Sequence, residues 1–347
     1  MSQKKSNQNA LGRLQDMARV QLFTGPTPLE EMPNLTREVG GGRLYVKRDD
    51  CTELAFGGNK VRQLEFYLGV AEAQGADTIL ITGAVQSNFA RLAAAGANKL
   101  GMQCHIQLED RVPKIPSAYL TSGNVLLDRL LGATMHSFPK GEDEVGADRQ
   151  LEIIAGDLRK QGRHPYVIHL SPGHVPLGTL GYVVAAEEIL KQLADKSLGV
   201  DEIVVASGSG NTHSGLLFGL RALGSSIRVT GICVRRDADE QAPRIFEHCG
   251  EIAKLLETDQ PVDQSDVMLS DAFLAPGYGQ ASDVVMQAIL DSARSEALML
   301  DPTYTGKSMV GFISRAASYT PDKNLLFIHT GGTPAIFCYH SEFDNSF

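Results

Sequence analysis

The chain has 347 residues, of which 43% are hydrophobic and 21% charged, and its formal net charge at pH 7 is −9. This length predicts about two domains, and the composition is typical of a soluble globular protein. A negative net charge gives no electrostatic attraction to nucleic acid or to an anionic membrane surface. The sequence contains no run of about 18 apolar residues, so it predicts no membrane-spanning helix. We therefore expect neither nucleic acid nor a membrane as a partner.

The cysteines and histidines predict neither disulfides nor a metal site. The five cysteines are an odd number, widely spaced and without a CxxC pair, which favours reduced thiols and a cytoplasmic location. The nine histidines include no HExxH motif and no cluster of metal-ligand spacing.

Short apolar runs alternate with helix-like segments along most of the chain. The predicted strands are Thr78–Ile81, Cys104–Leu108, Thr134–Ser137, Tyr166–Leu170, Glu202–Ala206, Arg228–Val234 and Leu325–His329. The predicted helices are Val61–Ala73, Ser87–Leu100, Ser117–Leu131, Glu144–Gln161, Gly181–Gln192 and Ser214–Leu223. This alternation predicts an α/β fold with parallel sheets covered by helices, in which ligands bind at the carboxyl ends of the strands.

The motif Gly57-Gly58-Asn59-Lys60 precedes a predicted helix. Two glycines allow a sharp bend, and the positive end of a helix dipole favours a deprotonated amine, as an imine with an aldehyde requires. On these residues alone, a solvated lysine at a helix start is the simpler interpretation. The next motif, Gln86-Ser87-Asn88, also opens a helix, so Ser87 is expected as an N-cap. Functionally, its hydroxyl could transfer a proton, and the Asn88 amide could hold a ring hydroxyl or a carboxylate.

The segment Ser207 to Gly215 follows a strand and opens a helix, and its small residues predict backbone N–H groups that converge on a phosphate. It lacks the Gly-Lys-Ser/Thr of a P-loop, and His213 replaces the third glycine of a dinucleotide motif. A plain turn is the structural alternative. Tyr278 lies between two glycines and Tyr304 lies in a loop, where each could reach a ligand or pack. Thr333 follows the last strand. No GxSxG motif is present, and the combined set suits pyridoxal phosphate.

With these motifs, the sequence resembles the fold-type II pyridoxal-phosphate enzymes, which are similar to the tryptophan synthase β subunit. Within them it resembles the branch of D-cysteine desulfhydrase, L-cysteate sulfo-lyase and 1-aminocyclopropane-1-carboxylate deaminase. The resemblance runs from about Phe23 to the end, and Leu44 to Cys51 with Gly57 to Lys60 is its most specific part.

The resemblance implies roles for individual residues. Lys60 would be the Schiff-base lysine, Ser87 the active-site hydroxyl, and Tyr278 and Tyr304 the residues that flank the substrate. The remaining cofactor contacts would be Asn88, the phosphate cup Gly208, Ser209, Gly210, Asn211 and Thr212, and Thr305 or Thr333 near the pyridine nitrogen. The substrate would meet Ser87, Asn88, Phe89 and His174.

Three positions distinguish the members of this branch. The deaminase has glutamate in place of Thr305 of this chain, glutamine in place of Phe89, and a residue without a hydroxyl in place of Thr333. A carboxylate would keep the pyridine nitrogen protonated for ring opening, so these residues favour the lyases. The lyases, however, usually have histidine at Phe89, and the loop Ser171–Gly178 also departs from their pattern. His174 in that loop could bind an anionic substituent or simply hydrogen-bond the loop.

The resemblance implies a larger domain from residues 1–56 and 173–347, a smaller domain from 57–172, and a homodimer. The expected reaction is α,β-elimination of D-cysteine, L-cysteate or a similar amino acid to pyruvate, ammonia and sulfide or sulfite. The alternatives are the deaminase, which gives 2-oxobutyrate, and a non-catalytic protein that binds a phosphate ligand. A NAD-dependent oxidoreductase is disfavoured by the broken glycine motif.

Overall fold

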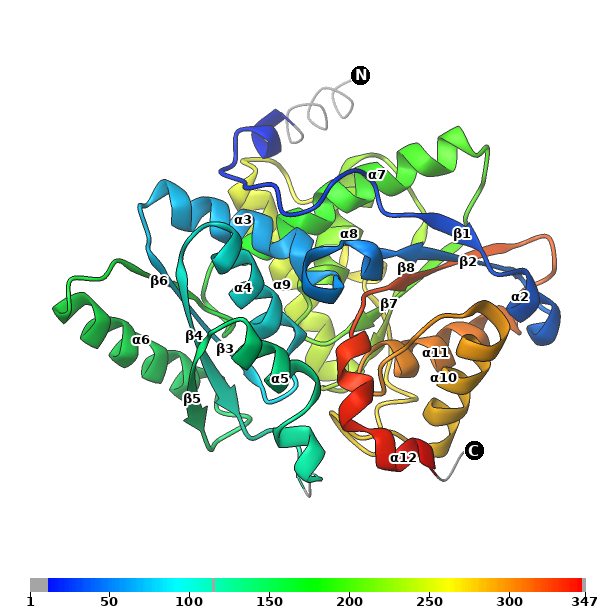
Figure 1. Cartoon of the computed structure of the whole chain (residues 1–347). Coiled ribbons are helices and arrows are strands. Elements are labelled where there is room, and N and C mark those ends of the chain that lie inside the picture. Colours follow the sequence, from blue (N-terminus) through cyan, green and yellow to red (C-terminus); the bar gives the residue numbers. More distant parts are fainter. Residues whose placement is uncertain (1–11, 114–115, 345–347) are drawn as a thin grey trace. The chain divides into compact units, whose positions relative to one another are not determined.

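The computed structural model describes residues 12–113 and 116–344, and the chain divides into two compact units (Figure 1). Unit 1 contains the start of the chain up to Met17, Gly25–Cys51 and Pro176–Gly331. Unit 2 contains Ala18–Thr24, Thr52–Val175 and the chain from Gly332 on. This grouping differs from the predicted division mainly in assigning the segments from Ala18 and from Gly332 to the unit that holds Lys60.

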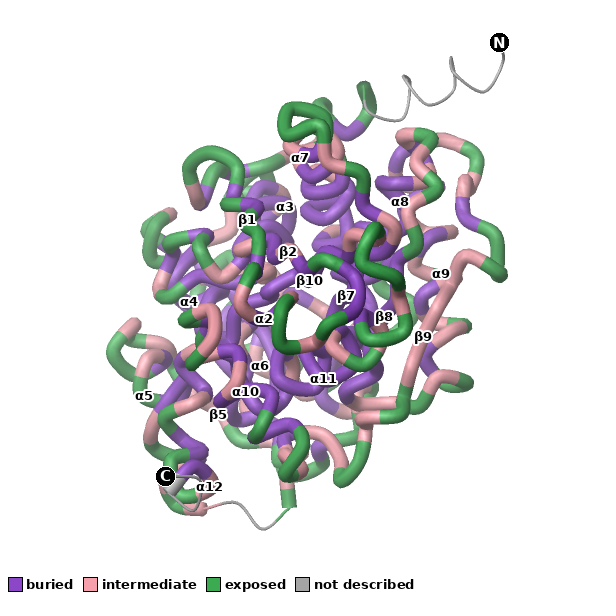
Figure 2. The backbone as a smooth tube through the Cα atoms, turned by 90° about the vertical axis from the view of Figure 1, so that its right-hand side faces the viewer, coloured by how far each residue is buried: buried purple, intermediate pink, exposed green. Residues whose placement is uncertain are grey.

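Unit 1 is built on a six-stranded sheet with the order β1-β2-β10-β7-β8-β9. The strands are β1 (Leu29–Glu31), β2 (Arg43–Arg48), β7 (Glu202–Ser207), β8 (Arg228–Cys233), β9 (Met268–Ser270) and β10 (Asn324–His329). All neighbours are parallel except β1, which runs antiparallel to β2 at the edge. Strand β7, in the interior of the sheet, is buried along its whole length (Figure 2), as its apolar run Ile203–Ala206 predicts.

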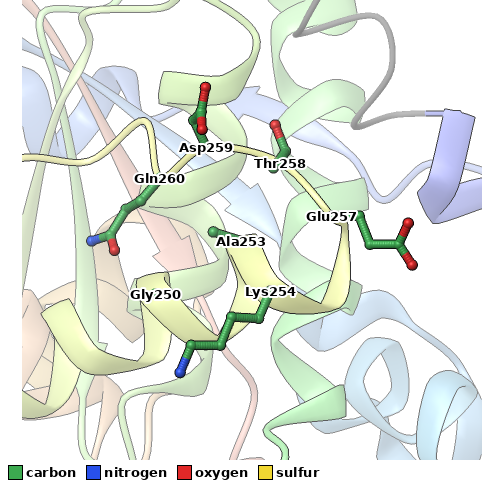
Figure 3. A pocket seen from close by; sticks show the side chains of 7 residues that line it. All are labelled: Gly250, Ala253, Lys254, Glu257, Thr258, Asp259 and Gln260. Atoms are coloured by element: carbon green, nitrogen blue, oxygen red, sulfur yellow. The ribbon is translucent and has the colours of Figure 1, made fainter.

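The helices of unit 1 are α2 (Pro33–Val39), α7 (Leu180–Asp195), α8 (Asn211–Ala222), α9 (Ala238–Leu255), α10 (Asp283–Glu296) and α11 (Thr305–Ala316). Helix α8 packs on β7, β8, α7 and α9, and α11 packs on β7, β8 and β10. A hollow near the end of α9 (Figure 3) is lined by Gly250, Ala253, Lys254, Glu257, Thr258, Asp259 and Gln260. None of the predicted site residues lines this hollow.

Unit 2 contains a fully parallel four-stranded sheet with the order β5-β4-β3-β6. Its strands are β3 (Thr78–Ala84), β4 (Gln103–Glu109), β5 (Thr134–Phe138) and β6 (Pro165–Ile168). Its helices are α3 (Lys60–Ala73), α4 (Asn88–Lys99), α5 (Gly123–Leu130), α6 (Glu144–Lys160) and α12 (His340–Asp344). Helices α4 and α6 both pack on β3 and β4. The parallel α/β architecture predicted from the sequence is therefore confirmed.

Two predicted helices have different limits in the structure. The helix predicted over Ser117–Leu131 is a 3-10 turn, Ser117–Leu120, followed by α5 from Gly123. The break occurs because the Gln86 side chain donates to the carbonyls of Tyr119 (2.6 Å) and Ser122 (3.0 Å), and Gly123 adopts a φ of 58°. Helix α8 begins at Asn211, three residues earlier than predicted, after Gly210 at a φ of 99°. Within the described parts of the chain, no helix combines the length and apolar character needed to cross a bilayer.

Candidate active site

Lys60 is the first residue of α3 and follows a glycine loop that is fixed from two sides. Gly57 and Gly58 have φ values of 60° and 125°, which residues with a Cβ rarely adopt. The Thr52 hydroxyl accepts from the N–H of Gly58 (2.8 Å) and donates to its carbonyl (3.1 Å). From α4, the Arg91 guanidinium donates to the carbonyl of Gly57 at 2.8 Å. The loop before the lysine is therefore held in place by Thr52 on one side and by Arg91 of α4 on the other.

The Lys60 amine has few partners for a partly buried amine. Its Nζ lies 3.3 Å from Gln63 Oε1 and 5.0 Å from the centroid of the Phe89 ring. Burial lowers the pKa of Lys60 from 10.5 to about 8, because the ammonium loses water without gaining a carboxylate. A substantial fraction of the amine is therefore neutral and nucleophilic near neutral pH.

Two other buried lysines differ from Lys60 because strong acceptors hold them. Lys47 forms an ion pair with Glu188 and also donates to the carbonyl of Thr27 at 2.6 Å. Lys307 donates to the carbonyls of Leu274 (2.7 Å) and Gly277 (2.6 Å), although burial lowers its pKa to about 8 as well. Among these three buried or partly buried amines, the contacts therefore leave Lys60 the best suited to form a covalent bond with an aldehyde.

Ser87 and Asn88 stand at the start of α4, where β3 ends. The Ser87 Oγ accepts from the N–H of Ala90 at 3.1 Å, so its expected N-cap role is confirmed. Its hydroxyl hydrogen is not used by this cap. The Asn88 Oδ1 accepts from Asn124 Nδ2 (2.9 Å) and from Arg91 Nη1 (3.2 Å), which fixes the amide plane. The helix cap therefore orients the Ser87 side chain, and the two hydrogen bonds to Oδ1 orient the Asn88 amide.

Arg91 is a site residue that the sequence analysis missed. It is fully buried and bonds to Gly57, Asn88 and Asn124, so it joins the lysine loop to the Ser87–Asn88 segment. Burial lowers its pKa to about 10 against the attraction of Asp128, which leaves it charged at neutral pH. An arginine in an alanine-rich helix gave no sequence signal, because two of its partners, Gly57 and Asn124, lie in other segments of the chain.

In unit 1, the predicted phosphate cup forms the turn between β7 and α8. The side chains of α9 bind its carbonyl oxygens: Gln241 donates to Gly208 (3.1 Å), and Arg244 donates to Ser209 (3.0 Å). Arg236 also donates to the carbonyl of Gly208 at 3.4 Å. These bonds engage the carbonyls of Gly208 and Ser209, and the first turn of α8, which follows directly, supplies backbone N–H donors. This geometry and the neighbouring guanidinium charges suit a phosphate.

His213, which replaces the third glycine of a dinucleotide motif, lies beneath the turn. Burial lowers its pKa to about 4, so it is neutral, and its Nδ1 lies 3.3 Å from Ser207 Oγ. A Cβ on Gly231 would lie 2.4 Å from His213 Nδ1, so the glycine in β8 makes room for the ring. His213 therefore packs in the core of the unit.

Tyr278 and Tyr304 come together in unit 1, and their hydroxyl groups are hydrogen-bonded to each other. Their rings meet edge to face, with centroids 5.8 Å apart. Lys307 holds the loop of Tyr278 through the carbonyl of Gly277, and this role of Lys307 was not predicted. The paired hydroxyls form a phenolic donor-acceptor unit that can pass a proton.

The two candidate threonines have different surroundings. Thr305 Oγ1 donates to Asp301 Oδ1 and accepts from the N–H of Asp301, both at 2.7 Å, which anchors the start of α11. Its proton is therefore engaged. Thr333 follows Gly331 and Gly332, which have φ values of 90° and 97°, and begins a 3-10 turn in unit 2.

Phe89 is buried, and its ring packs against Tyr67 at a centroid distance of 6.0 Å. His174 stacks on His169 in the loop after β6.

A lysine with a lowered pKa at a helix start and a phosphate cup on a parallel α/β framework are the features of a pyridoxal-phosphate enzyme. A family model described as pyridoxal-phosphate dependent enzyme matches residues 20–331, and the chain belongs to this family. The residues present fit the cofactor, since Lys60 offers a weakly bound amine and the Gly208–Thr212 segment leads into the N-terminus of α8, whose first N–H groups can bind a phosphate.

The chain is 41% identical over 332 residues to the D-cysteine desulfhydrase of Salmonella choleraesuis (strain SC-B67), covering 95% of this chain and 98% of the relative. The D-cysteine desulfhydrase of Salmonella typhi gives the same identity and coverage. A crystal structure of an ACC deaminase homologue matches with a TM-score of 0.86 and 36% identity, over 98% of this chain and 99% of that chain. The predicted family, fold class and cofactor are therefore confirmed.

Proposed function

We propose that this chain is a pyridoxal-phosphate-dependent carbon–sulfur lyase that eliminates the sulfur substituent of a cysteine-like amino acid, with D-cysteine as its first candidate substrate. The observation that carries the proposal is the 41% identity to D-cysteine desulfhydrases over 95% of the chain, together with the weakly held Lys60 amine. Overall, D-cysteine and water would give pyruvate, ammonia and hydrogen sulfide. L-cysteate would release sulfite in place of sulfide.

The bound cofactor would supply an electron sink for the negative charge that develops at the α-carbon when its proton leaves. The chain's own residues would move the protons. The neutral Lys60 amine, or the Ser87 hydroxyl, would take the α-proton. The Tyr278–Tyr304 pair would donate a proton to the departing sulfur, and the electron pair of the broken carbon–sulfur bond would leave with it.

Binding roles follow from the orientation of the remaining side chains. Gly208, Ser209, Gly210, Asn211 and Thr212 would hold the phosphate. Asn88, whose oxygen is occupied by Asn124 and Arg91, would offer its amide N–H₂ to the cofactor ring or to the substrate carboxylate. Thr333 would serve the pyridine nitrogen in preference to Thr305, because the proton of Thr305 is bound to Asp301. Phe89 would line the substrate side, beside the Lys60 amine.

The deaminase is the second candidate, favoured by the 36% identity and TM-score of 0.86 with the ACC deaminase homologue. The threonines at positions 305 and 333 argue against it, because neither hydroxyl would hold a protonated pyridine nitrogen as firmly as the glutamate that the deaminase has in place of Thr305. We further propose a cytoplasmic homodimer that acts in amino-acid metabolism. The five cysteines are free, and four of them are buried, which supports a reducing compartment.

The test is a substrate panel with purified holoenzyme: D-cysteine, L-cysteine, L-cysteate and 1-aminocyclopropane-1-carboxylate. Pyruvate, 2-oxobutyrate, sulfide and sulfite are measured separately. The proposal predicts pyruvate with an equal amount of sulfide from D-cysteine, or of sulfite from L-cysteate, and none from a Lys60→Ala variant. Formation of 2-oxobutyrate alone would establish the deaminase instead. Light scattering on the same sample tests the dimer.

A further inference from the structure

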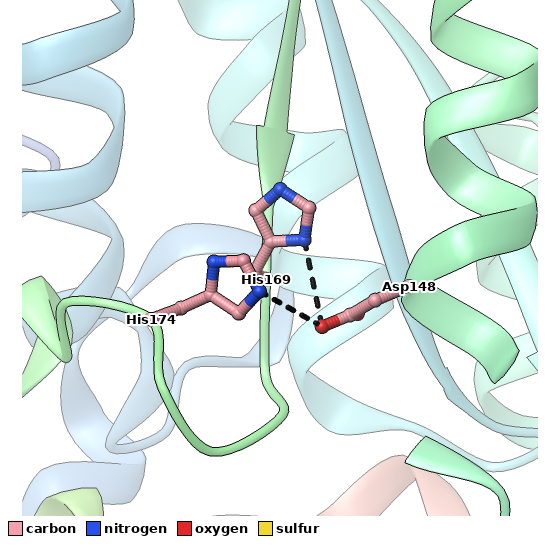
Figure 4. A group of neighbouring side chains, drawn as sticks. All are labelled: Asp148, His169 and His174. Carbon is pink, nitrogen blue, oxygen red and sulfur yellow. Dashed lines mark ion pairs between the residues drawn. The ribbon is translucent and has the colours of Figure 1, made fainter. Parts of the chain in front are cut away.

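Three side chains of unit 2 that take no part in the proposed proton transfers converge on one point (Figure 4). Asp148 lies near the start of α6, His169 directly follows β6, and His174 lies in the loop after it. One atom from each, a carboxylate oxygen and two ring nitrogens, lies within 4.8 Å of the others. His169 Nδ1 is 3.5 Å and His174 Nε2 is 3.8 Å from Asp148 Oδ2. Both imidazoles therefore face the same carboxylate.

The hydrogen bonds around His169 fix which ring nitrogen carries the proton. Its Nε2 lies 3.1 Å from Glu152 Oε1, and because an ionised carboxylate only accepts, Nε2 must be the donor. In a neutral imidazole, Nδ1 then presents its lone pair to the Asp148 carboxylate. At 3.5 Å from Asp148 Oδ2 this contact is longer than an N–H···O bond, and His169 Nδ1 is buried without a hydrogen-bond partner among the described residues. Lone pairs that face each other in this way call for a positive charge between them.

The three candidate ligand atoms indicate which kind of cation would fit the cluster. Two imidazole nitrogens and one carboxylate oxygen suit Zn²⁺ and its neighbours, whereas Mg²⁺ and Ca²⁺ prefer oxygen ligands alone. The outer contacts also match those of metal sites, in which a ligand histidine donates its second N–H to a carboxylate. Here Glu152 accepts from His169, and the Ser171 hydroxyl and N–H both donate to Asp148 Oδ2. His174 is 44% exposed, which leaves room for a water as the fourth ligand.

We propose that Asp148, His169 and His174 form a binding site for a divalent first-row transition ion of the zinc type, with water completing a tetrahedron. The ion would join α6 to the loop that follows β6. Because β6 and β3 are parallel neighbours, that loop leaves the same edge of the sheet as the segment that leads to Ser87. The ion would thus brace this edge without taking part in elimination, and His174 would be a metal ligand. The proposal does not depend on the identity of the substrate.

The test uses PLP-loaded protein that carries Cys51→Ser, because this exposed thiol could bind metal by itself. After treatment with a chelator, the protein is titrated with Co²⁺ and then with Zn²⁺ as competitor, by visible absorption and calorimetry. We expect about one ion per chain, with the intense visible bands of tetrahedral Co²⁺ and displacement by Zn²⁺. Cofactor absorbance and circular dichroism report folding in every sample.

Variants distinguish this cluster from general surface binding. His169→Asn, His174→Asn and Asp148→Asn should abolish the Co²⁺ bands, and Glu152→Gln should weaken binding about tenfold or more. His136→Asn is the matched control, since His105 and His136 also form a stacked pair, with ring nitrogens 3.0 Å apart. This control should bind Co²⁺ as the parent does. His174 is on an exposed loop, so its variant should fold even where Asp148→Asn does not.

Two results would overturn the proposal. The first is that the parent protein does not bind Co²⁺, or binds it no more tightly than a folded His174→Asn protein does. The other is a His136→Asn variant that loses as much binding as His174→Asn. In the absence of metal binding, an NMR titration showing a proton held by His169 near neutral pH would identify a proton as the charge within the cluster.

Discussion

The lowered pKa of Lys60 makes a prediction that can be measured lysine by lysine. With a pKa of about 8, roughly 9% of the amine is neutral at pH 7, whereas at 10.5 the neutral fraction is only about 0.03%. The folded environment therefore raises the reactive fraction about 300-fold. The sign follows from desolvation, which disfavours the charged form of an amine and moves its titration to lower pH.

Competitive acetylation of the apoenzyme, read out by mass spectrometry of peptides, gives the pH profile of each lysine. Lys60 should reach half of its maximal reactivity near pH 8 and level off above it. Lys254 is the internal control, because it is exposed and its ion pair with Glu251 raises its pKa above 10.5. Bound cofactor should protect Lys60, while Lys307 should be labelled to the same extent with and without cofactor. A Lys60 profile that still rises at pH 10, parallel to Lys254, would refute the reasoning.

Three substitutions test the groups around the lysine. Ser87→Ala should lower kcat by about 100-fold or more if the hydroxyl moves a proton. Because it removes only a helix cap, it should lower the free energy of unfolding by only about 1 kcal/mol. The control is Asp237→Ala, which removes the N-cap of α9 and should lose similar stability while it keeps full activity. Arg91→Met should destabilise unit 2 by about 3 kcal/mol and speed cofactor loss, since it removes the bond to Gly57; unchanged cofactor release would contradict this role. Tyr278→Phe should lower kcat about 100-fold with little change in KM, whereas a raised KM with kcat unchanged would indicate a binding role instead.

The sequence was informative wherever local chemistry determines the structure. Apolar runs such as Ile203–Ala206 predicted buried parallel strands, because both faces of such a strand are covered. Ser87 was predicted as a helix cap from the residues beside it alone, and its hydroxyl caps α4 in the structure. These features depend on neighbours in the chain, and the structure contains each of them.

Features that depend on distant partners were missed. The helix predicted over Ser117–Leu131 breaks because Gln86, from another segment, captures its carbonyls. Arg91 and Lys307 bond to loop carbonyls that a sequence pattern does not reveal. Asp148 meets His169 because α6 and the strand that follows it, β6, pack antiparallel, so that the start of the helix lies beside the end of the strand; histidine spacing gave no signal of this cluster.

The central claim is that Lys60 is the amine that holds the cofactor. Borohydride reduction of the holoenzyme, followed by proteolysis and peptide mass mapping, locates that attachment directly. The account predicts the cofactor mass on the peptide containing Lys60, and no such mass in a Lys60→Ala protein. The same mass on Lys307 or Lys47, or an unmodified Lys60 in a protein that retains activity, would contradict it.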